Sequence, residues 1–201
     1  MPKRIRTFIA VGIPAAIREQ LGELQQSLAP HAEDVKWVDP DKVHLTIKFL
    51  GEVDERDIYE VCKRVGEVAG AWVAFECSVA RAGAFPNATR PRVIWAGVSS
   101  GAAELTEIHD ALDDALGELG YPLENRSFTP HFTIGRVRRT APNPKLRAAV
   151  DSLADWQAGS FRVSEILVMA SDLSSDGPTY SVMGRGRLGA ADSSGRDNVN
   201  D

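Results

Sequence analysis

The chain carries one four-residue pattern twice, His-x-Thr-Ile, first at His44–Ile47 and again at His131–Ile134, 87 residues later. Each copy lies in an apolar run typical of a β-strand. With 8 threonines in 201 residues, two of four histidines would each precede Thr by two positions in about one random sequence in a hundred. The repeat therefore predicts two similar strands that carry equivalent side chains.

Strand geometry predicts which motif side chains lie together, because side chains two residues apart lie on the same face of a strand. His44 and Thr46 should share one face, as should His131 and Thr133, while the apolar residues next to them point into the core. Each motif strand would then have one polar face and one apolar face. Two such strands could line a cleft between two half-sheets.

Hydrophobic periodicity predicts an α+β fold with antiparallel or mixed sheets. A doubly wound parallel sheet fits less well, since the sequence has no glycine-rich turn between a strand and a helix. Helices are expected over residues 14–28, 54–69, 102–119 and 144–153, and strands over 6–12, 35–38, 43–50, 73–80, 92–98, 128–137, 161–169 and 180–188. Gly51 should end the third strand and Asp54 should cap the second helix, with a loop at residues 83–91.

Composition is that of a globular protein, 43% hydrophobic and 25% charged, with one bilobal domain over residues 1–188. Residues 189–201 are small and polar, and we expect a disordered tail there. No apolar run reaches the ~20 residues of a membrane helix and the N-terminus lacks a signal-peptide pattern, so the expected location is the cytoplasm. Cys62 and Cys77 lack the spacing of a zinc or redox motif and should be reduced and buried.

The net charge of −5 argues against a protein that coats nucleic acid, because such binding depends on many Lys and Arg contacts. It leaves room for a site at one RNA terminus, which needs only a few cations around one phosphate.

Two histidines and two threonine hydroxyls suit phosphodiester displacement. One imidazole would accept a proton from attacking water and the other would donate one to the leaving ribose oxygen, since only His titrates near neutral pH. The threonine hydroxyls would donate hydrogen bonds to the phosphate oxygens. The scheme needs no metal and no other cofactor, and neither copy has an adjacent carboxylate. A single His-x-Thr is most often structural; the pair favours catalysis.

Other residues are weaker candidates. Lys48 falls on the strand face of the first motif and could bind the phosphate or the RNA backbone, although a solvent-facing lysine at a strand end fits equally well. Phe49 and Phe85 could stack on the terminal base, and core packing would explain both as readily. His31 and His109 have no matching context and are expected in an exposed loop and on a helix surface.

At these residues the sequence resembles the 2H phosphoesterase superfamily, and within it the RNA 2′,3′-cyclic phosphodiesterases, also called 2′-5′ RNA ligases or LigT-like proteins. The likeness covers nearly the whole chain up to about Leu188. Besides the two motifs, it includes residues 6–11, 37–40, 48–51, 83–86, 91–95, 130, 135–136 and 178–180. The resemblance implies a bilobal fold in which two related lobes, each with a mostly antiparallel sheet and flanking helices, face each other across a central cleft.

The resemblance also implies roles for the site residues. His44 would protonate the leaving 3′ oxygen and His131 would activate water, leaving RNA with a 2′-phosphate, while Thr46 and Thr133 hold the phosphate. Arg136 matches an arginine that follows the second motif in the family and would contact the substrate. Simple alternation points Arg136 away from the second histidine, so this role requires a strand end or a bulge.

Several functions stay open at this point. The same residues could run hydrolysis or its reverse, 2′-5′ ligation. Alternatives are a phosphodiesterase for small cyclic or 2′-5′-linked nucleotides, such as a cyclic phosphate of ADP-ribose, and a non-catalytic module that binds RNA ends. A non-catalytic module would be expected to lack at least one histidine or threonine of the two motifs, and all four of these residues are present. We expect a monomer whose partners are RNA termini or small cyclic nucleotides, without a membrane partner.

Overall fold

The computed structural model describes residues 2–139, 141–174 and 177–190, and within them nine strands form one sheet. The strand order is β7-β4-β5-β6-β3-β1-β8-β9, with β2 paired to β6, and the pairings between these strands are antiparallel. The strands are β1 Arg4–Val11, β2 Val35–Trp37, β3 Leu45–Asp54, β4 Phe75–Phe85, β5 Val93–Ser100, β6 His131–Val137, β7 Gln157–Val163, β8 Glu165–Ser174 and β9 Gly177–Arg187. The helices are α1 Ala15–Leu28, α2 Ile58–Gly70, α3 Ala102–Gly117 and α4 Pro144–Asp151, with short 3-10 turns η1 Ala29–His31 and η2 Pro40–Lys42. The predicted α+β class is confirmed.

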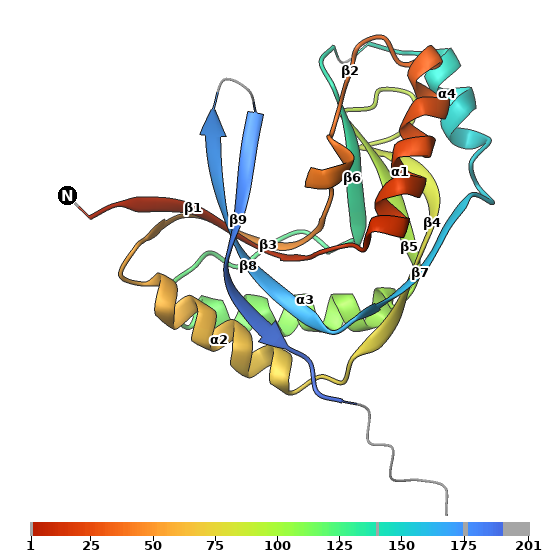
Figure 1. Cartoon of the computed structure of the whole chain (residues 1–201). Coiled ribbons are helices and arrows are strands. Elements are labelled where there is room, and N and C mark those ends of the chain that lie inside the picture. Colours follow the sequence, from red (N-terminus) through yellow and green to blue (C-terminus); the bar gives the residue numbers. More distant parts are fainter. Residues whose placement is uncertain (1, 140, 175–176, 191–201) are drawn as a thin grey trace, which may run out of the picture.

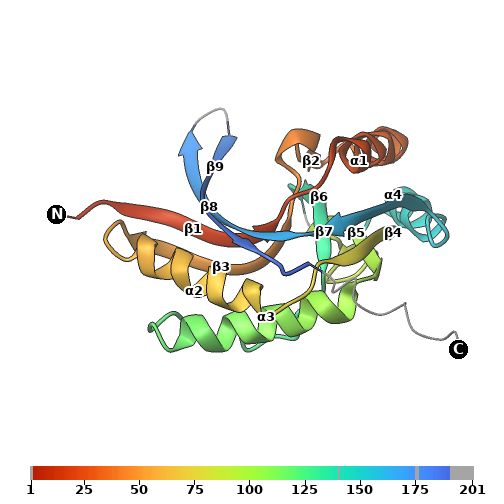
Figure 2. The same cartoon turned by 60° about the horizontal axis from the view of Figure 1, so that its bottom comes forward.

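The sheet is nearly divided where β3 meets β6, because these strands pair only through Leu45 and Phe132. Strands β6, β5, β4 and β7 lie on one side of this junction, and β3, β1, β8 and β9 on the other. Helices α1 and α4 lie beside the first group, and α2 and α3 lie together against the second (Figures 1 and 2). Each of the two repeated motifs therefore belongs to a different half.

The helices form where the sequence places apolar residues at helical spacing. In α1 the buried stripe runs through Ile17, Leu21, Leu24 and Leu28, and in α3 through Leu105, Ile108, Leu112 and Leu116. These stripes pack into one core that also holds the buried residues of the central strands. Burial of each large side chain stabilises the fold by about 1.5–3 kcal/mol, so the helices hold the junction of the two half-sheets in place.

Two expected boundaries near the first motif are wrong. Gly51 does not end the strand; it adopts a φ of +73° and β3 continues to Asp54, because β1 supplies hydrogen-bonding partners along this stretch. Asp54 does not cap α2 either. Its carboxylate accepts a hydrogen bond of 3.0 Å from the backbone N–H of Arg56, and the N-cap position belongs to Asp57.

Three further expectations need correction. Strand β4 continues to Phe85, which pairs with Val93, so residues 83–85 are not a loop. The strand expected over 161–169 is two strands, since β7 pairs with β4 and β8 pairs with β1. Gly189 belongs to the fold rather than to a tail, because it bridges Val73 and its N–H donates to the Trp72 carbonyl at 2.7 Å. The rest of the expected tail, residues 191–201, lies outside the described residues.

Within the described part of the chain, no helix has both the length and the apolar character that crossing a membrane requires.

Candidate functional site

The candidate site lies at the junction of the two half-sheets. Leu45 and Phe132 face each other across β3 and β6, and both are fully buried. The residues on either side of each are the His and Thr of the two motifs, and all four are partly exposed. Since neighbours in a strand point to opposite faces, the four polar side chains lie together on the face opposite the core.

The register of this pair sets which residues are neighbours. With Leu45 opposite Phe132 in an antiparallel pair, His44 stands opposite Thr133 and Thr46 stands opposite His131. Each histidine therefore lies beside the threonine of the other motif. The structure brings together the four residues that the sequence selected, although their catalytic roles remain predictions.

Both histidines are held by the same hydrogen bond. Nδ1 of His44 lies 2.8 Å from the carbonyl oxygen of Lys42, and Nδ1 of His131 lies 2.7 Å from the carbonyl oxygen of Thr129. A carbonyl oxygen only accepts hydrogen bonds, so Nδ1 carries the proton and donates it in both rings. Nε2 is thus the atom that can gain or lose a proton in each imidazole, which is the requirement for acid and base chemistry.

The surroundings lower the pKa of both motif histidines. Burial is the largest cause for His44 and for His131, because it disfavours the charged ring. The backbone carbonyl bonds act in the opposite direction and raise each pKa, while the positive charge of Arg136 lowers both. The same guanidinium acts on both rings, which places Arg136 near the two of them.

A β-bulge explains how Arg136 reaches this face. The register between β5 and β6 shifts between Ile94 and Trp95, which leaves Ile134 as an extra residue in β6. The extra residue reverses the side-chain alternation, so Arg136 lies on the face of His131 rather than on the opposite one. The structure therefore contains the bulge that a substrate contact by Arg136 requires, and that contact stays a prediction.

The expectation for Lys48 is wrong. A register shift opposite β1 makes Ile47 an extra residue in β3, and this turns Lys48 away from the face of His44. Lys48 is 0% exposed, forms an ion pair with Asp113 of α3 and donates a hydrogen bond of 2.8 Å to the Pro122 carbonyl. It is neither on the phosphate side nor a solvent-facing lysine.

The two candidate aromatic residues differ in their surroundings. The Phe85 ring lies 5.0 Å from the His131 ring at a steep angle of 83°, and 5.3 Å from the Trp95 ring. Phe49 is 58% exposed and lies 6.1 Å from Phe8. Core packing does not account for Phe49, and Phe85 packs directly against the second motif, so both stay candidates for base stacking.

Sequence reasoning missed three aromatic residues around the histidines. Phe8 and Tyr180 surround His44, with ring centroids 4.8 and 5.1 Å from the imidazole. Burial raises the pKa of Tyr180. Trp95 lies over Gly83, where a Cβ would come within 2.2 Å of the indole ring. All three lie in segments that resemble the 2H phosphoesterases, 6–11 for Phe8, 91–95 for Trp95 and 178–180 for Tyr180, and this resemblance was the available signal.

Of the remaining histidines, His31 is exposed as expected, in η1. The expectation for His109 is wrong, since this residue is 3% exposed. Its ring stacks on Phe128 at 4.4 Å, and its Nδ1 lies 2.9 Å from an Asp110 carboxylate oxygen. The spacing was a signal for this burial, because His109 lies four residues after Leu105 and three before Leu112, on the buried stripe of α3.

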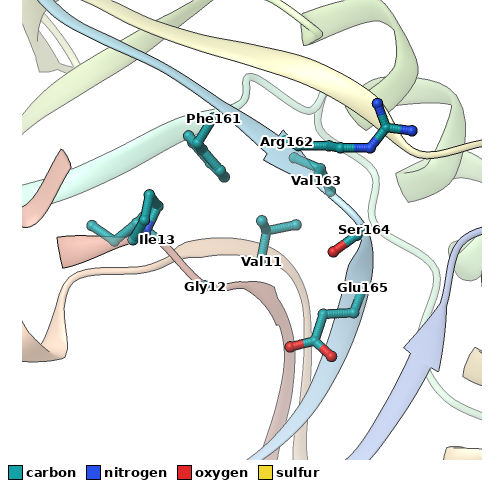
Figure 3. Close-up of a pocket in the computed structure, with 9 residues that line it drawn as sticks. Val11, Gly12, Ile13, Phe161, Arg162, Val163, Ser164 and Glu165 are labelled. Atoms are coloured by element: carbon teal, nitrogen blue, oxygen red, sulfur yellow. The ribbon is translucent and has the colours of Figure 1, made fainter. Parts of the chain in front are cut away.

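A cavity of about 360 Å³ lies elsewhere, between the end of β1 and the β7–β8 connection (Figure 3). Val11, Ile13 and Phe161 point toward one another there, and Arg162 points away. None of the four motif residues lines this cavity, so it is separate from the candidate site.

Comparison with known proteins agrees with this arrangement. The family model described as "LigT like Phosphoesterase" matches residues 11–95 and 97–180. Each matched segment contains one His-x-Thr motif and each motif comes from one half of the sheet.

Similar proteins extend over the whole fold. A protein of Methanothermobacter thermautotrophicus named RNA 2′,3′-cyclic phosphodiesterase is 32% identical over 180 residues, covering 90% of this chain and 97% of its own. A protein of the same name from Aquifex aeolicus is 34% identical over 188 residues, covering 93% of this chain and 99% of its own.

Solved structures agree as well. One from Thermus thermophilus has a TM-score of 0.78 with 27% identity, covering 92% of this chain and 98% of that one. The structure of E. coli LigT complexed with 3′-AMP has a TM-score of 0.74 with 26% identity, covering 92% of this chain and 99% of the LigT chain. Matched in both halves by the family model and along almost its full length by these relatives, the chain belongs to the LigT-like phosphoesterases of the 2H phosphoesterase superfamily.

Proposed function

We propose that this protein hydrolyses RNA ends that carry a 2′,3′-cyclic phosphate, giving RNA with a 2′-phosphate. One observation carries the proposal: two histidines with the same tautomer, each beside the other motif's threonine, share one face at the junction of the half-sheets. The names of the relatives supply the substrate class, because they are called RNA 2′,3′-cyclic phosphodiesterases.

The proposed reaction is a displacement at phosphorus. A water oxygen attacks the phosphorus atom while Nε2 of His131 takes the water proton, and the bond from phosphorus to the 3′ oxygen breaks. Nε2 of His44 gives its proton to that leaving oxygen. The reaction ends with His131 protonated and His44 neutral, and exchange with solvent restores the starting state. The same displacement, with a 5′-hydroxyl in place of water, would give a 2′-5′ linkage.

Neutral and charged donors would stabilise the phosphate. Thr46 and Thr133 flank the buried junction pair on the histidine face and can donate hydroxyl hydrogen bonds to the two non-bridging oxygens as charge builds there. Arg136 brings a positive charge to the same face and can pair with the phosphate. Its charge also holds both histidine pKa values down, which favours the neutral form needed by the base.

The two histidines have nearly equivalent surroundings, so the assignment of acid and base rests on the resemblance of each motif to its family counterpart. An activated substrate separates the two roles. Bis(4-nitrophenyl) phosphate releases a stable phenolate and needs no acid, so His44→Ala should lose much less activity on it than on RNA, whereas His131→Ala should lose activity on both. The opposite pattern would exchange the two roles.

The first experiment is turnover of a short RNA with a 2′,3′-cyclic phosphate end in the presence of EDTA, with separation of 2′- from 3′-phosphate products. We expect 2′-phosphate product from the unaltered protein and a loss of about 10²–10⁴-fold in each single histidine variant. His31→Ala is the matched control, because it removes an exposed histidine side chain from η1, outside both motifs. Failure of the unaltered protein to act, or activity that survives both motif substitutions, would refute the proposal.

We further propose that the enzyme is a monomer in the cytoplasm. Both cysteines are free, which suits a reducing compartment. Size-exclusion chromatography with light scattering tests the first part, since a mass well above the 21.8 kDa of one chain would refute it.

A further inference from the structure

Three exposed cations continue the histidine face along β6 and β2. Lys36 pairs directly with Arg136, and the backbone N–H of Arg138 donates to the Asp34 carbonyl at 2.8 Å, which continues the same register. Residues that face each other, and residues two apart on a strand, share a face. Lys36, Arg136 and Arg138 therefore lie in one group on the side of the sheet that carries His131.

These cations are free to bind an anion. All three are exposed, and none forms an ion pair with a carboxylate in the part of the chain that the structure describes, the nearby Asp34 included. Several other cations are paired, such as Arg64 with Glu118 and Arg185 with Glu165. In a protein with a net charge of −5, an unpaired group beside the candidate site marks a local positive field.

The spacing of the group suits a nucleic acid strand. Alternate residues of a strand lie about 6.6–6.8 Å apart, from a rise of ~3.3–3.4 Å per residue, and cross-strand neighbours lie about 5 Å apart. Successive phosphates of an extended single strand have comparable separations. Positively charged surfaces that track the backbone, with aromatic side chains nearby for the bases, are typical of proteins that bind single strands. Phe85 and Trp95 supply such rings at the start of the group.

We propose that Lys36 and Arg138, which continue from Arg136 at the terminal cyclic phosphate, form a subsite for the phosphodiester backbone on the 5′ side of that phosphate. This subsite makes the enzyme select the end of an RNA strand over a cyclic mononucleotide, which lacks the phosphates that the cations would bind. The inference rests on the proposed function, because it assumes that a cyclic phosphate occupies the histidine site.

The test compares two substrates that share their reacting end. Adenosine 2′,3′-cyclic phosphate and a ten-nucleotide RNA that ends in the same group are turned over by the unaltered protein and by the Lys36→Ala/Arg138→Ala double variant. Arg136 is left in place because its charge acts on the histidines. The control is Lys63→Ala/Lys145→Ala, which also removes two exposed positive charges, but on helices α2 and α4, whose apolar residues pack into the core opposite the histidine face.

We expect the double variant to raise the KM for the ten-nucleotide RNA about 5- to 20-fold and to keep most of its kcat. The preference for the oligonucleotide over the mononucleotide should fall by the same factor. The slope of log(kcat/KM) against log[salt] for the oligonucleotide should become shallower by about 1.4, from ~0.7 for each lost phosphate contact on a single strand. The control variant should keep the preference and the slope of the unaltered protein.

Three results would overturn the inference and leave the proposed function standing. These are an unaltered protein without preference for the oligonucleotide, an equal loss on both substrates in the double variant, and an equal loss of preference in the control. An unaltered protein that acts on neither substrate refutes the proposed function itself.

Discussion

Breaking the buried ion pair between Lys48 and Asp113 should destabilise the protein strongly, whichever partner is removed. Lys48 lies on β3, in the strand of the first motif, and its side chain has 0% exposure, while that of Asp113 on α3 has 13%. Lys48 also donates to the Pro122 carbonyl, and Asp113 accepts from the backbone N–H of Glu124. The pair thus ties the central sheet to α3 and to the segment that leads to the second motif.

The magnitude follows from the charge left behind. Removal of one partner of a buried ion pair costs about 3–5 kcal/mol, because the remaining charge stays buried without compensation. Asp113→Leu should lie at the upper end of this range, since it leaves a fully buried ammonium. Lys48→Met should lie at the lower end, near ~3 kcal/mol, because the Asp113 carboxylate keeps some exposure and its bond from Glu124.

The assay is urea unfolding together with thermal melting at pH 7. For a protein of this length, each kcal/mol shifts Tm by about 2–4 °C, so the single variants should melt roughly 6–20 °C lower. The Lys48→Met/Asp113→Leu double variant removes both charges, and replacing a buried pair by apolar residues is often neutral or stabilising. It should therefore be more stable than either single variant.

This prediction also separates a structural lysine from a phosphate ligand. If Lys48 bound substrate, Lys48→Met would lose activity and keep its stability. A melting temperature unchanged in Lys48→Met, or a double variant less stable than both single variants, would refute the assignment of a buried structural pair.

Two further substitutions address the site directly. Arg136→Met removes a charge that lowers the pKa of both motif histidines, so both limbs of the pH profile of kcat/KM should move to higher pH. Arg136→Lys keeps the charge and should leave the limbs in place, and limbs that stay fixed in Arg136→Met would contradict the electrostatic role. Gly83→Ala places a Cβ within 2.2 Å of the Trp95 ring and should cost about 1–3 kcal/mol of stability and change the tryptophan emission. The control is Gly66→Ala in α2, where nothing lies within 4 Å of the added Cβ, and equal effects of the two alanines would contradict the packing argument.

Local pattern was sufficient for much of the fold. The apolar stripe of α1, from Ile17 to Leu28, and that of α3, from Leu105 to Leu116, predicted helices that the structure contains. Strand ends were less predictable: Gly51 looks like a stop signal, yet β3 continues because β1 offers hydrogen bonds beyond it. A strand ends where its partner ends, and the partner is distant in sequence.

The burial of His109 was only partly a matter of tertiary structure. Its position on α3 indicates burial, because it lies four residues after Leu105 and three before Leu112. The ring is also covered by Phe128, which lies nineteen residues further along the chain. A contact of this kind depends on the path of the connecting segment, and helical periodicity contains no information about that path.

For the site, the sequence by itself determined the four residues of the two motifs and the face they share, because the two-residue alternation of a strand is a local property. Only the tertiary structure decided on which face Lys48 and Arg136 lie. Lys48 follows the fourth residue of its motif by one position and Arg136 follows its own by two. In each case that fourth residue, Ile47 in β3 and Ile134 in β6, is the extra residue of a bulge. A bulge depends on register against a neighbouring strand, so it turned Lys48 into the core and brought Arg136 to the histidines.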